Sequence, residues 1–360
     1  MVLQTKIVCN IRKLVIYGKY KNIVMRKLLF ATLVFLSSFC FSQTKSILFV
    51  GNSYTQCNGG LENMLKSLAA SKGVEIDAEA SAIGGYSLQK HCSNQQTLDK
   101  IRSKAWDYVV LQELSVNPAY PPEVVDTLTY PYAKILSDMV HDQSICTQLY
   151  FYMTWGRKNG YLSDTTYMPL TSYDGMQRRL AESYCEMAVD NDGSVAPVGI
   201  AWKYVRDNYP EINLYTEDGS HPSPQGTYLA ACVFYASIFK TSPVGATFTY
   251  GINVEEANIL QNVAAVVVLK NMEEWRLDLK PKCEEYGTGK RSIVSFSTIA
   301  TDGKLMFNKN ITSDYTIYSY TGKLCKQSRL LGSCIDVSDL SSGLYLIKLG
   351  NDEARKFVIE

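Results

Sequence analysis

Short apolar runs alternate with longer segments of helical spacing from Ser46 to about residue 276. The short runs are rich in β-branched and aromatic residues and predict strands at Ser46–Val50, Val74–Ala82, Tyr108–Gln112, Gln148–Met153 and Val195–Gly199. Apolar positions spaced i, i+3, i+4 predict helices at Leu61–Lys72, Val124–His141, Met176–Asn191, Ser223–Phe239 and Val254–Leu277. This order favours the α/β class, a three-layer α/β/α sandwich in which helices cover both faces of a parallel sheet.

The pattern changes beyond Lys280, where period-2 alternation replaces helical spacing. Asp302-Gly303 and Thr321-Gly322 are turn signals between apolar runs. The predicted strands here are Ile317–Tyr320, Ile335–Val337, Gly343–Lys348 and Lys356–Ile359. We therefore expect a domain at 43–280, a linker at 281–294, and a small C-terminal all-β sandwich domain at 295–360.

The first 42 residues have the pattern of a leader. A positive start at 25–27 precedes the uncharged run Leu28–Phe41, and small residues stand at the −3 and −1 positions in Cys40-Phe41-Ser42. The pattern predicts a cleaved signal peptide at 25–42, with translation starting at Met25 and residues 1–24 not part of the natural product; the alternative is a buried helix. About 14 apolar residues are too few to span a bilayer. We expect an exported protein with no transmembrane segment in its mature chain.

The distribution of charge argues against one class of function, nucleic-acid binding. The chain has 36 basic and 35 acidic side chains, but seven of the basic ones and none of the acidic ones lie in residues 1–42. The remainder therefore has 29 basic against 35 acidic side chains, which argues against a nucleic-acid-binding surface.

Eight of the ten cysteines remain after removal of the leader, in a compartment where thiols tend to pair. Cys325 with Cys334, which flank an expected hairpin, and more weakly Cys57 with Cys92, are the predicted disulfides. No cysteine or histidine cluster has the spacing of a metal site.

Candidate chemistry follows from the rule that ligands of open α/β sheets bind at the carboxyl ends of the strands. Ser53 follows the first strand in Gly51-Asn52-Ser53, where a glycine permits a sharp turn and a hydroxyl is presented. Ser53 is a candidate nucleophile, although serine is also a common helix cap. Asn52 beside it is a candidate for substrate binding.

A second candidate group lies in Asp218-Gly219-Ser220-His221. A carboxylate three residues before an imidazole can accept its Nδ1–H while Nε2 faces a nucleophile. Of the three histidines, only His221 has an acid at this spacing in a glycine-containing turn. The alternative is an Asp-capped helix start with a surface histidine.

A serine nucleophile also needs donors for the developing oxyanion. Gly84-Gly85, after the second strand, offers an unhindered backbone amide, and Gln112 offers a side-chain amide at the end of the third. Trp155, after the fourth strand, is either an aromatic platform for a sugar ring or a core residue.

Together these residues resemble the ordered blocks of the SGNH (GDSL-like) hydrolase superfamily: Ser53, then Gly85, then a side-chain amide, then Asp218 with His221. The resemblance covers about residues 46–240 and implies a flavodoxin-like fold that hydrolyses esters without a metal or organic cofactor. The superfamily usually has Gly-x-Asn-Asp at its third block, where this chain has Gln112-Glu113. Some carbohydrate O-acetylesterases of the superfamily use glutamine there.

The resemblance therefore implies the catalytic residues Ser53, Asp218 and His221, and an oxyanion hole made by Ser53, Gly85 and Gln112, with Asn117 as the alternative to Gln112. We expect a secreted serine esterase acting on small acyl groups, acetyl first, of carbohydrate. The alternatives are a non-catalytic glycan-binding protein on the same fold, and a lipase or thioesterase.

The tail resembles the C-terminal sorting domain of the type IX secretion system. The resemblance is carried by Ile317-Tyr318-Ser319-Tyr320-Thr321-Gly322-Lys323, Asp336-Val337-Ser338-Asp339-Leu340, Ser342-Gly343-Leu344-Tyr345 and Lys356-Phe357-Val358-Ile359. It implies an outer-membrane translocon as partner, passage through the periplasm, and a final place at or outside the cell surface. The alternative is a carbohydrate-binding or stabilising β-domain.

Overall fold

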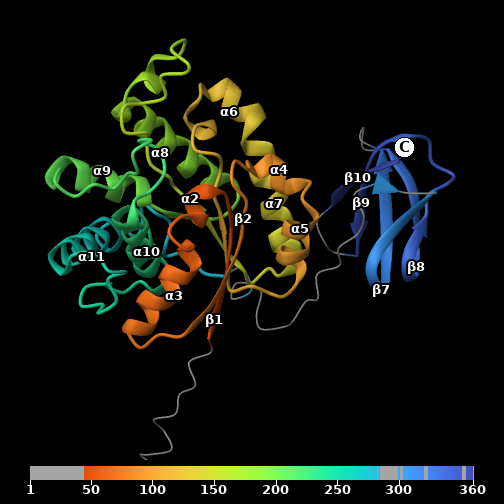
Figure 1. Ribbon diagram of the computed structural model, residues 1–360. Helices are drawn as coiled ribbons and strands as arrows, with labels where there is room; N and C mark the ends of the chain where they lie inside the picture. Colours follow the sequence, from red (N-terminus) through yellow and green to blue (C-terminus); the bar gives the residue numbers. More distant parts are fainter. Residues whose placement is uncertain are drawn as a thin grey trace, which may run out of the picture. The chain divides into compact units, whose positions relative to one another are not determined.

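A five-stranded parallel sheet forms the centre of the N-terminal domain (Figure 1) in the computed structural model, which describes residues 44–281, 283, 299–300, 303–319, 323–350 and 354–359. Its strands are β1 (Lys45–Gly51), β2 (Ile76–Ala82), β3 (Tyr108–Leu111), β4 (Gln148–Tyr152) and β5 (Ser194–Ala196). They pair in the order β2-β1-β3-β4-β5, all parallel. Strand β3 is buried at every position, as expected for a strand covered on both faces.

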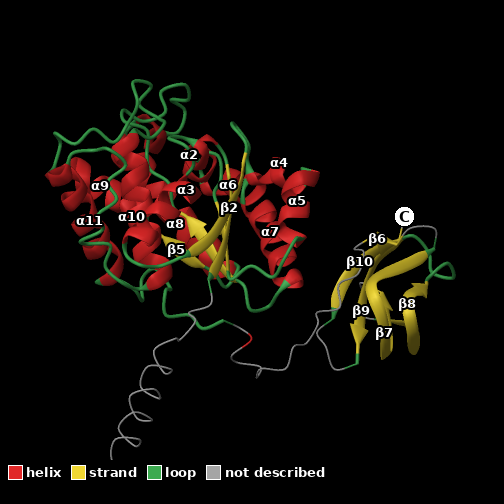
Figure 2. Ribbon diagram, turned by 60° about the horizontal axis from the view of Figure 1, so that its bottom comes forward, coloured by secondary structure: helices red, strands yellow, loops and turns green. Residues whose placement is uncertain are grey.

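Helices cover both faces of this sheet, which confirms the predicted three-layer α/β fold (Figures 1 and 2). Helices α3 and α10 pack together on one face, and α10 also packs on α9 and α11; α4, α5, α7 and α8 form the other layer. The helices are α2 (Ser53–Gln56), α3 (Leu61–Ser71), α4 (Leu88–Cys92), α5 (Gln95–Arg102), α6 (Pro122–Leu128), α7 (Tyr130–Gln143), α8 (Tyr173–Asp190), α9 (Val198–Asn208), α10 (Pro224–Phe239) and α11 (Val254–Leu269), with short 3-10 turns η1 (Asn117–Ala119) and η2 (Met168–Thr171).

Three predicted boundaries were wrong. The fifth strand ends at Ala196 and α9 begins at Val198, so the predicted strand to Gly199 runs into a helix. The helix predicted over 124–141 is two helices, α6 and α7, because Pro131 has no backbone N–H with which to continue α6. Helix α11 ends at Leu269 rather than 277.

The C-terminal segment is a separate all-β unit, as predicted. It contains β6 (Ile299–Ala300), β7 (Lys304–Ser319), β8 (Leu324–Asp336), β9 (Gly343–Leu349) and β10 (Arg355–Ile359). Its described strands form one sheet in the order β6-β10-β9-β7-β8 rather than two distinct sheets, because the long β7 pairs with both β8 and β9. A register shift between Met306 and Ile311 interrupts the β7–β8 pairing. The side chains of one face form a core that includes Leu305, Ile317 and Phe357.

The disulfide joins Cys146 to Cys283, and both predicted pairs were wrong. Cys325 and Cys334 lie on the same strand, β8, so nine extended residues, roughly 30 Å, separate them. Cys92 instead points to the backbone carbonyl of Tyr132 on α7. The Cys146–Cys283 bond ties the loop before β4 to the segment that follows the N-terminal domain.

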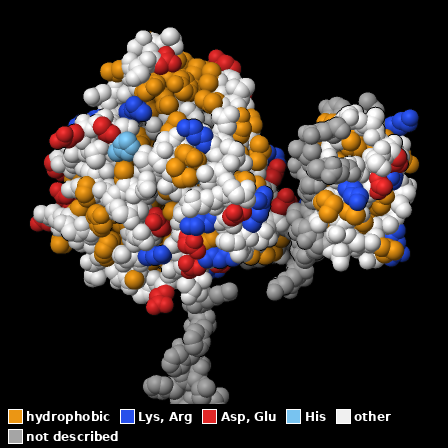
Figure 3. Space-filling model, turned by 45° about the vertical axis from the view of Figure 1, so that its right-hand side comes forward, with side chains coloured by type: hydrophobic (Ala, Val, Ile, Leu, Met, Phe, Trp, Pro, Cys, Tyr) orange, Lys and Arg blue, Asp and Glu red, His pale blue; other side chains and the backbone are white. Residues whose placement is uncertain are grey.

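The predicted leader, 1–42, and most of the predicted linker lie outside the described residues. None of the helices in the described part of the chain combines the length and apolar character needed to cross a lipid bilayer. On the face drawn in Figure 3, basic and acidic side chains are interspersed rather than gathered into one basic area.

Candidate active site

Ser53 is the first residue of α2, directly beyond the carboxyl end of β1. Asn52 caps this short helix by accepting from Tyr54 N at 3.1 Å. Position 51, before Asn52, has no room for a side chain, because a Cβ on Gly51 would lie 2.5 Å from Gln112 Oε1. The chain therefore turns directly after β1 and presents the Ser53 side chain at the carboxyl end of the parallel strands.

Asp218 and His221 lie on a tight turn between α9 and α10. The turn is closed by Thr216 N donating to His221 O at 2.9 Å, and Gly219 adopts a φ of +64° that favours glycine. Within it, Asp218 Oδ2 lies 2.5 Å from His221 Nδ1. On the other side of the ring, His221 Nε2 lies 2.9 Å from Ser53 Oγ. The structure thus brings the three predicted catalytic side chains into one hydrogen-bonded line.

The Asp218 carboxylate is held in its charged form. Partial burial acts to raise its pKa, but hydrogen bonds from His221, Ser220 N and Thr216 outweigh that effect and keep the pKa well below its ordinary value. A charged carboxylate on Nδ1 fixes the tautomer in which Nε2 can accept a proton from a hydroxyl group.

Buried aromatic residues anchor the turn against the helix that contains Ser53. Tyr54 Oη lies 2.7 Å from Ser220 Oγ, and Trp155 Nε1 donates to Ser220 O at 3.0 Å. Trp155 is fully buried, stacked between Tyr54 and Trp202. Of the two interpretations of Trp155, the structure supports the core residue and not the exposed sugar platform.

The backbone amides of Ser53 and Gly85 are two of the predicted oxyanion donors. Among the described residues, neither Ser53 N nor Gly85 N has a hydrogen-bond partner. Asn52 holds the two loops together, because its Nδ2 donates to Tyr86 O at 2.9 Å. Asn52 is only 2% exposed and its side chain connects the two loops, whereas the sequence predicted substrate binding for it.

The structure does not present the Gln112 side chain as the predicted third oxyanion donor. Gln112 is fully buried; its Oε1 accepts from Asn52 N at 2.9 Å and from Thr55 Oγ1 at 3.0 Å. Its Nε2 donates to the backbone carbonyl of Glu113. The buried Gln112 carboxamide therefore stabilises the turn between β1 and α2 through these hydrogen bonds.

The alternative residue, Asn117, is also buried, and its Nδ2 donates to Glu113 Oε1 at 3.2 Å. Glu113 further accepts from Leu88 N at 3.1 Å and Leu114 N at 2.6 Å. Burial raises the pKa of this carboxyl group to about 7, against the opposing effect of these hydrogen bonds. Glu113 and Asn117 thus form a buried polar group behind the site.

Sequence reasoning missed the supporting residues Thr216, Tyr54 and His91. His91 is buried, and its Nε2 donates to Gly51 O at 2.8 Å, which fixes the turn before Ser53. Tyr54 and Thr216 adjoin the predicted motifs, but nothing in the sequence indicates which way their side chains point.

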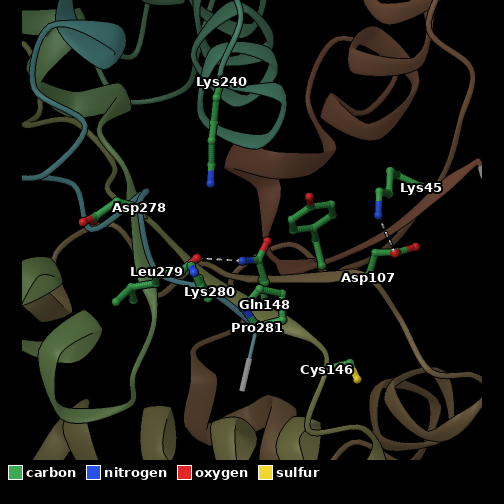
Figure 4. A pocket seen from close by; sticks show the side chains of 10 residues that line it. Lys45, Asp107, Cys146, Gln148, Lys240, Asp278, Leu279, Lys280 and Pro281 are labelled. Carbon is green, nitrogen blue, oxygen red and sulfur yellow. Dashed lines mark hydrogen bonds and ion pairs between the residues drawn. The ribbon is translucent and has the colours of Figure 1, made fainter. Parts of the chain in front are cut away.

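A cavity of about 350 Å³ lies beside the Asp218–His221 turn, lined by Asp218, Gly219 and residues 157–163. Its volume is within the range of small-molecule sites, roughly 300–1,000 Å³. Another cavity, of about 410 Å³, lies at the amino-terminal end of the parallel strands (Figure 4). It is lined by Lys240 and by the Lys45–Asp107 ion pair, far along the strands from Ser53.

Comparison with known families identifies the tail. Residues 297–360 match the family described as secretion system C-terminal sorting domain. This match confirms the resemblance of the tail and indicates export through the secretion system that recognises such domains.

Comparison with solved structures concerns the N-terminal domain. A DUF4886 family protein from Bacteroides uniformis has 18% identity and a TM-score of 0.52, over 62% of this chain and 95% of its own. A protein from Slackia heliotrinireducens, named as a proposed SGNH hydrolase, has 29% identity and a TM-score of 0.44 over 53% and 97%. A catalytic mutant of an acetylxylan esterase from Geobacillus stearothermophilus has 13% identity and a TM-score of 0.40 over 58% and 95%. The first of these likenesses supports the fold alone. A comparison with curated protein sequences found no match.

Proposed function

We propose that the N-terminal domain is a serine esterase. The observation that supports this most strongly is the continuous line from Asp218 through His221 to Ser53, with contacts of 2.5 and 2.9 Å. A serine hydroxyl is a weak nucleophile at its own pKa and needs an adjacent base to take its proton. An Asp-capped helix start with a surface histidine would not require the second contact.

In the proposed reaction, Ser53 Oγ attacks the ester carbonyl carbon while His221 Nε2 takes the hydroxyl proton. The amides of Ser53 and Gly85 donate to the oxyanion that forms. The tetrahedral intermediate collapses, the alcohol leaves with the proton from His221, and the acyl group stays on Ser53. Water then attacks this acyl ester while His221 takes the water proton; the second tetrahedral intermediate collapses, His221 returns the proton to Ser53 Oγ, and the acid is released.

The finer assignment is removal of small acyl groups, acetyl first, from carbohydrate. It rests on the sequence resemblance to carbohydrate O-acetylesterases, on the small cavity beside the turn, and on the sorting domain, which indicates export. We further propose passage through the periplasm and a final place at or outside the cell surface.

The test is hydrolysis of p-nitrophenyl acetate by the wild type and by the Ser53→Ala variant. Ser103→Ala is a matched control, because Ser103 is exposed at the end of α5, at the opposite edge of the sheet. We expect activity in the wild type and the control and none above background in Ser53→Ala. Equal rates in all three proteins would contradict the catalytic assignment.

The substrate class is then tested by measuring acetate release from a panel of acetylated glycans. Hydrolysis of p-nitrophenyl esters of increasing acyl length is measured in parallel. Preference for long acyl chains would indicate a lipase or thioesterase instead. Saturable binding of a polysaccharide with no ester hydrolysis at all would indicate a glycan-binding protein on this fold.

A further inference from the structure

Arg157 lies in the loop that follows β4, at the same edge of the sheet as Ser53. This loop rests directly on the turn of the proposed catalytic residues, because Lys158 N donates to Gly219 O at 2.8 Å. Arg206 holds it from the other side through a hydrogen bond of 3.3 Å to Lys158 O. The backbone at Arg157 is therefore fixed relative to Asp218 and His221.

The Arg157 guanidinium forms no ion pair with any carboxylate in the described part of the chain. Its Nη2 donates weakly to Ser115 Oγ at 3.4 Å, and its Cζ lies 4.7 Å from the ring centroid of Tyr161. Its Nε is buried and has no hydrogen-bond partner. Arg179, in contrast, is satisfied by Glu182 and by the Tyr120 carbonyl.

Arg157 also lines the 350 Å³ cavity beside the turn. The acidic groups near it are already engaged: Asp218 accepts from His221, Ser220 and Thr216, and Asp164 accepts from Thr166. Lys158, which also lines the cavity, is exposed and adds positive charge.

The guanidinium lies near Tyr54, the residue that follows Ser53. Burial raises the pKa of the hydroxyl of Tyr54, the neighbour of Ser53, and the charge of Arg157 acts against that effect. Tyr54 in turn contacts the His221 ring edge-on, with centroids 5.6 Å apart. Because Arg157 and Asp218 line the same cavity beside the turn, this cavity is the place where a substrate with its ester at Ser53 would put a further group.

We propose that Arg157 binds a carboxylate carried by the substrate, so that the site takes acyl esters of acidic sugars such as uronates. A guanidinium presents parallel donors that match the two oxygens of a carboxylate, and this one has no carboxylate partner among the described residues. This inference rests on the proposed esterase function and names its substrate class.

The test uses O-acetylated polygalacturonate and the same polymer after conversion of its carboxylates to methyl esters. Acetate release at low substrate concentration gives kcat/KM for each form. We expect the full-length wild type to favour the free carboxylate about 10- to 100-fold, the range of a hydrogen-bonded charged pair. Arg157→Gln should bring the ratio close to one, and Arg157→Lys should restore only part of it. Arg102→Gln, at an exposed position on α5, removes the same charge and should leave the ratio unchanged.

A wild type that prefers the methylated polymer, or releases acetate from neither polymer while hydrolysing p-nitrophenyl acetate through Ser53, would overturn the inference and leave the esterase proposal standing. A ratio that Arg157→Gln does not change would also overturn it. Absence of Ser53-dependent hydrolysis of any ester would refute the proposed function, and this inference with it. The wild-type ratio needs no variant, so a misfolded variant cannot hide a negative result.

Discussion

Glu113 makes the stability of the N-terminal domain depend on pH. The carboxyl group is buried behind the site without a cationic partner among its described contacts, and burial raises its pKa from 4.5 to about 7. The folded protein keeps the proton up to about pH 7, whereas the unfolded chain releases it near 4.5. Unfolding therefore releases a proton between these values, so the free energy of unfolding falls as pH rises from about 4.5 to 7.

The magnitude follows from the two pKa values. A rise from 4.5 to about 7 costs the folded state about 3 kcal/mol above pH 7, at about 1.4 kcal/mol for each pKa unit. Glu113→Gln removes the titration. The difference in unfolding free energy between the wild type and this variant should therefore shift by about 3 kcal/mol across the interval, at the expense of the wild type at high pH.

Urea unfolding at several pH values between 4.5 and 8, followed by tryptophan fluorescence, measures this difference. All four tryptophans lie in the N-terminal domain, so the signal reports on that domain alone. Glu123→Gln serves as control, because Glu123 is exposed in the first turn of α6. Parallel pH profiles for wild type and Glu113→Gln would refute the reasoning.

Two further predictions concern the site. Asp218→Asn replaces an acceptor of the His221 Nδ1–H by a group that can stabilise the wrong tautomer, and we expect kcat for p-nitrophenyl acetate to fall by about 10³- to 10⁴-fold; an unchanged kcat would exclude Asp218 from the mechanism. Gln112→Leu leaves Asn52 N without its acceptor and should lower the free energy of unfolding in urea by about 1–3 kcal/mol. A large loss of kcat with unchanged stability would instead favour the oxyanion-donor role that the sequence suggested for Gln112.

The order of elements and the meeting of Ser53, His221 and Asp218 could be predicted because local signals mark the segments that contain them. Hydrophobic period separates the strands from the helices, and the carboxyl-edge rule selects the polar residues that follow the strands. Ser53 and His221 are 168 residues apart, yet both lie in turns whose glycines and short polar residues are legible in the sequence. The resemblance to the ordered blocks of the SGNH superfamily then joins these two turns into one predicted site.

The orientation of Gln112 and the disulfide pairing could not be predicted from local signals. Strand β3 is buried on both faces, so no alternation of polar and apolar residues reveals the direction of the next side chain. Gln112 turns inward and accepts hydrogen bonds, although its residue type alone suits a donor. The disulfide was missed because it connects segments 137 residues apart, with no local pattern to pair them.

The geometry of the site depends on two consecutive residues with opposite orientations. Ser53 faces the imidazole, while Tyr54 points inward and contacts Ser220 in the turn that contains that imidazole. Because both residues belong to one short helix capped by Asn52, the distance between nucleophile and base is set by the packing of Tyr54 as well as by the turn itself. The stack of Tyr54 on Trp155 and of Trp155 on Trp202 extends this support into the core. The aromatic residues near the site thus contribute by fixing the position of the proposed catalytic residues, while the proposed recognition of the substrate belongs to the loop that contains Arg157.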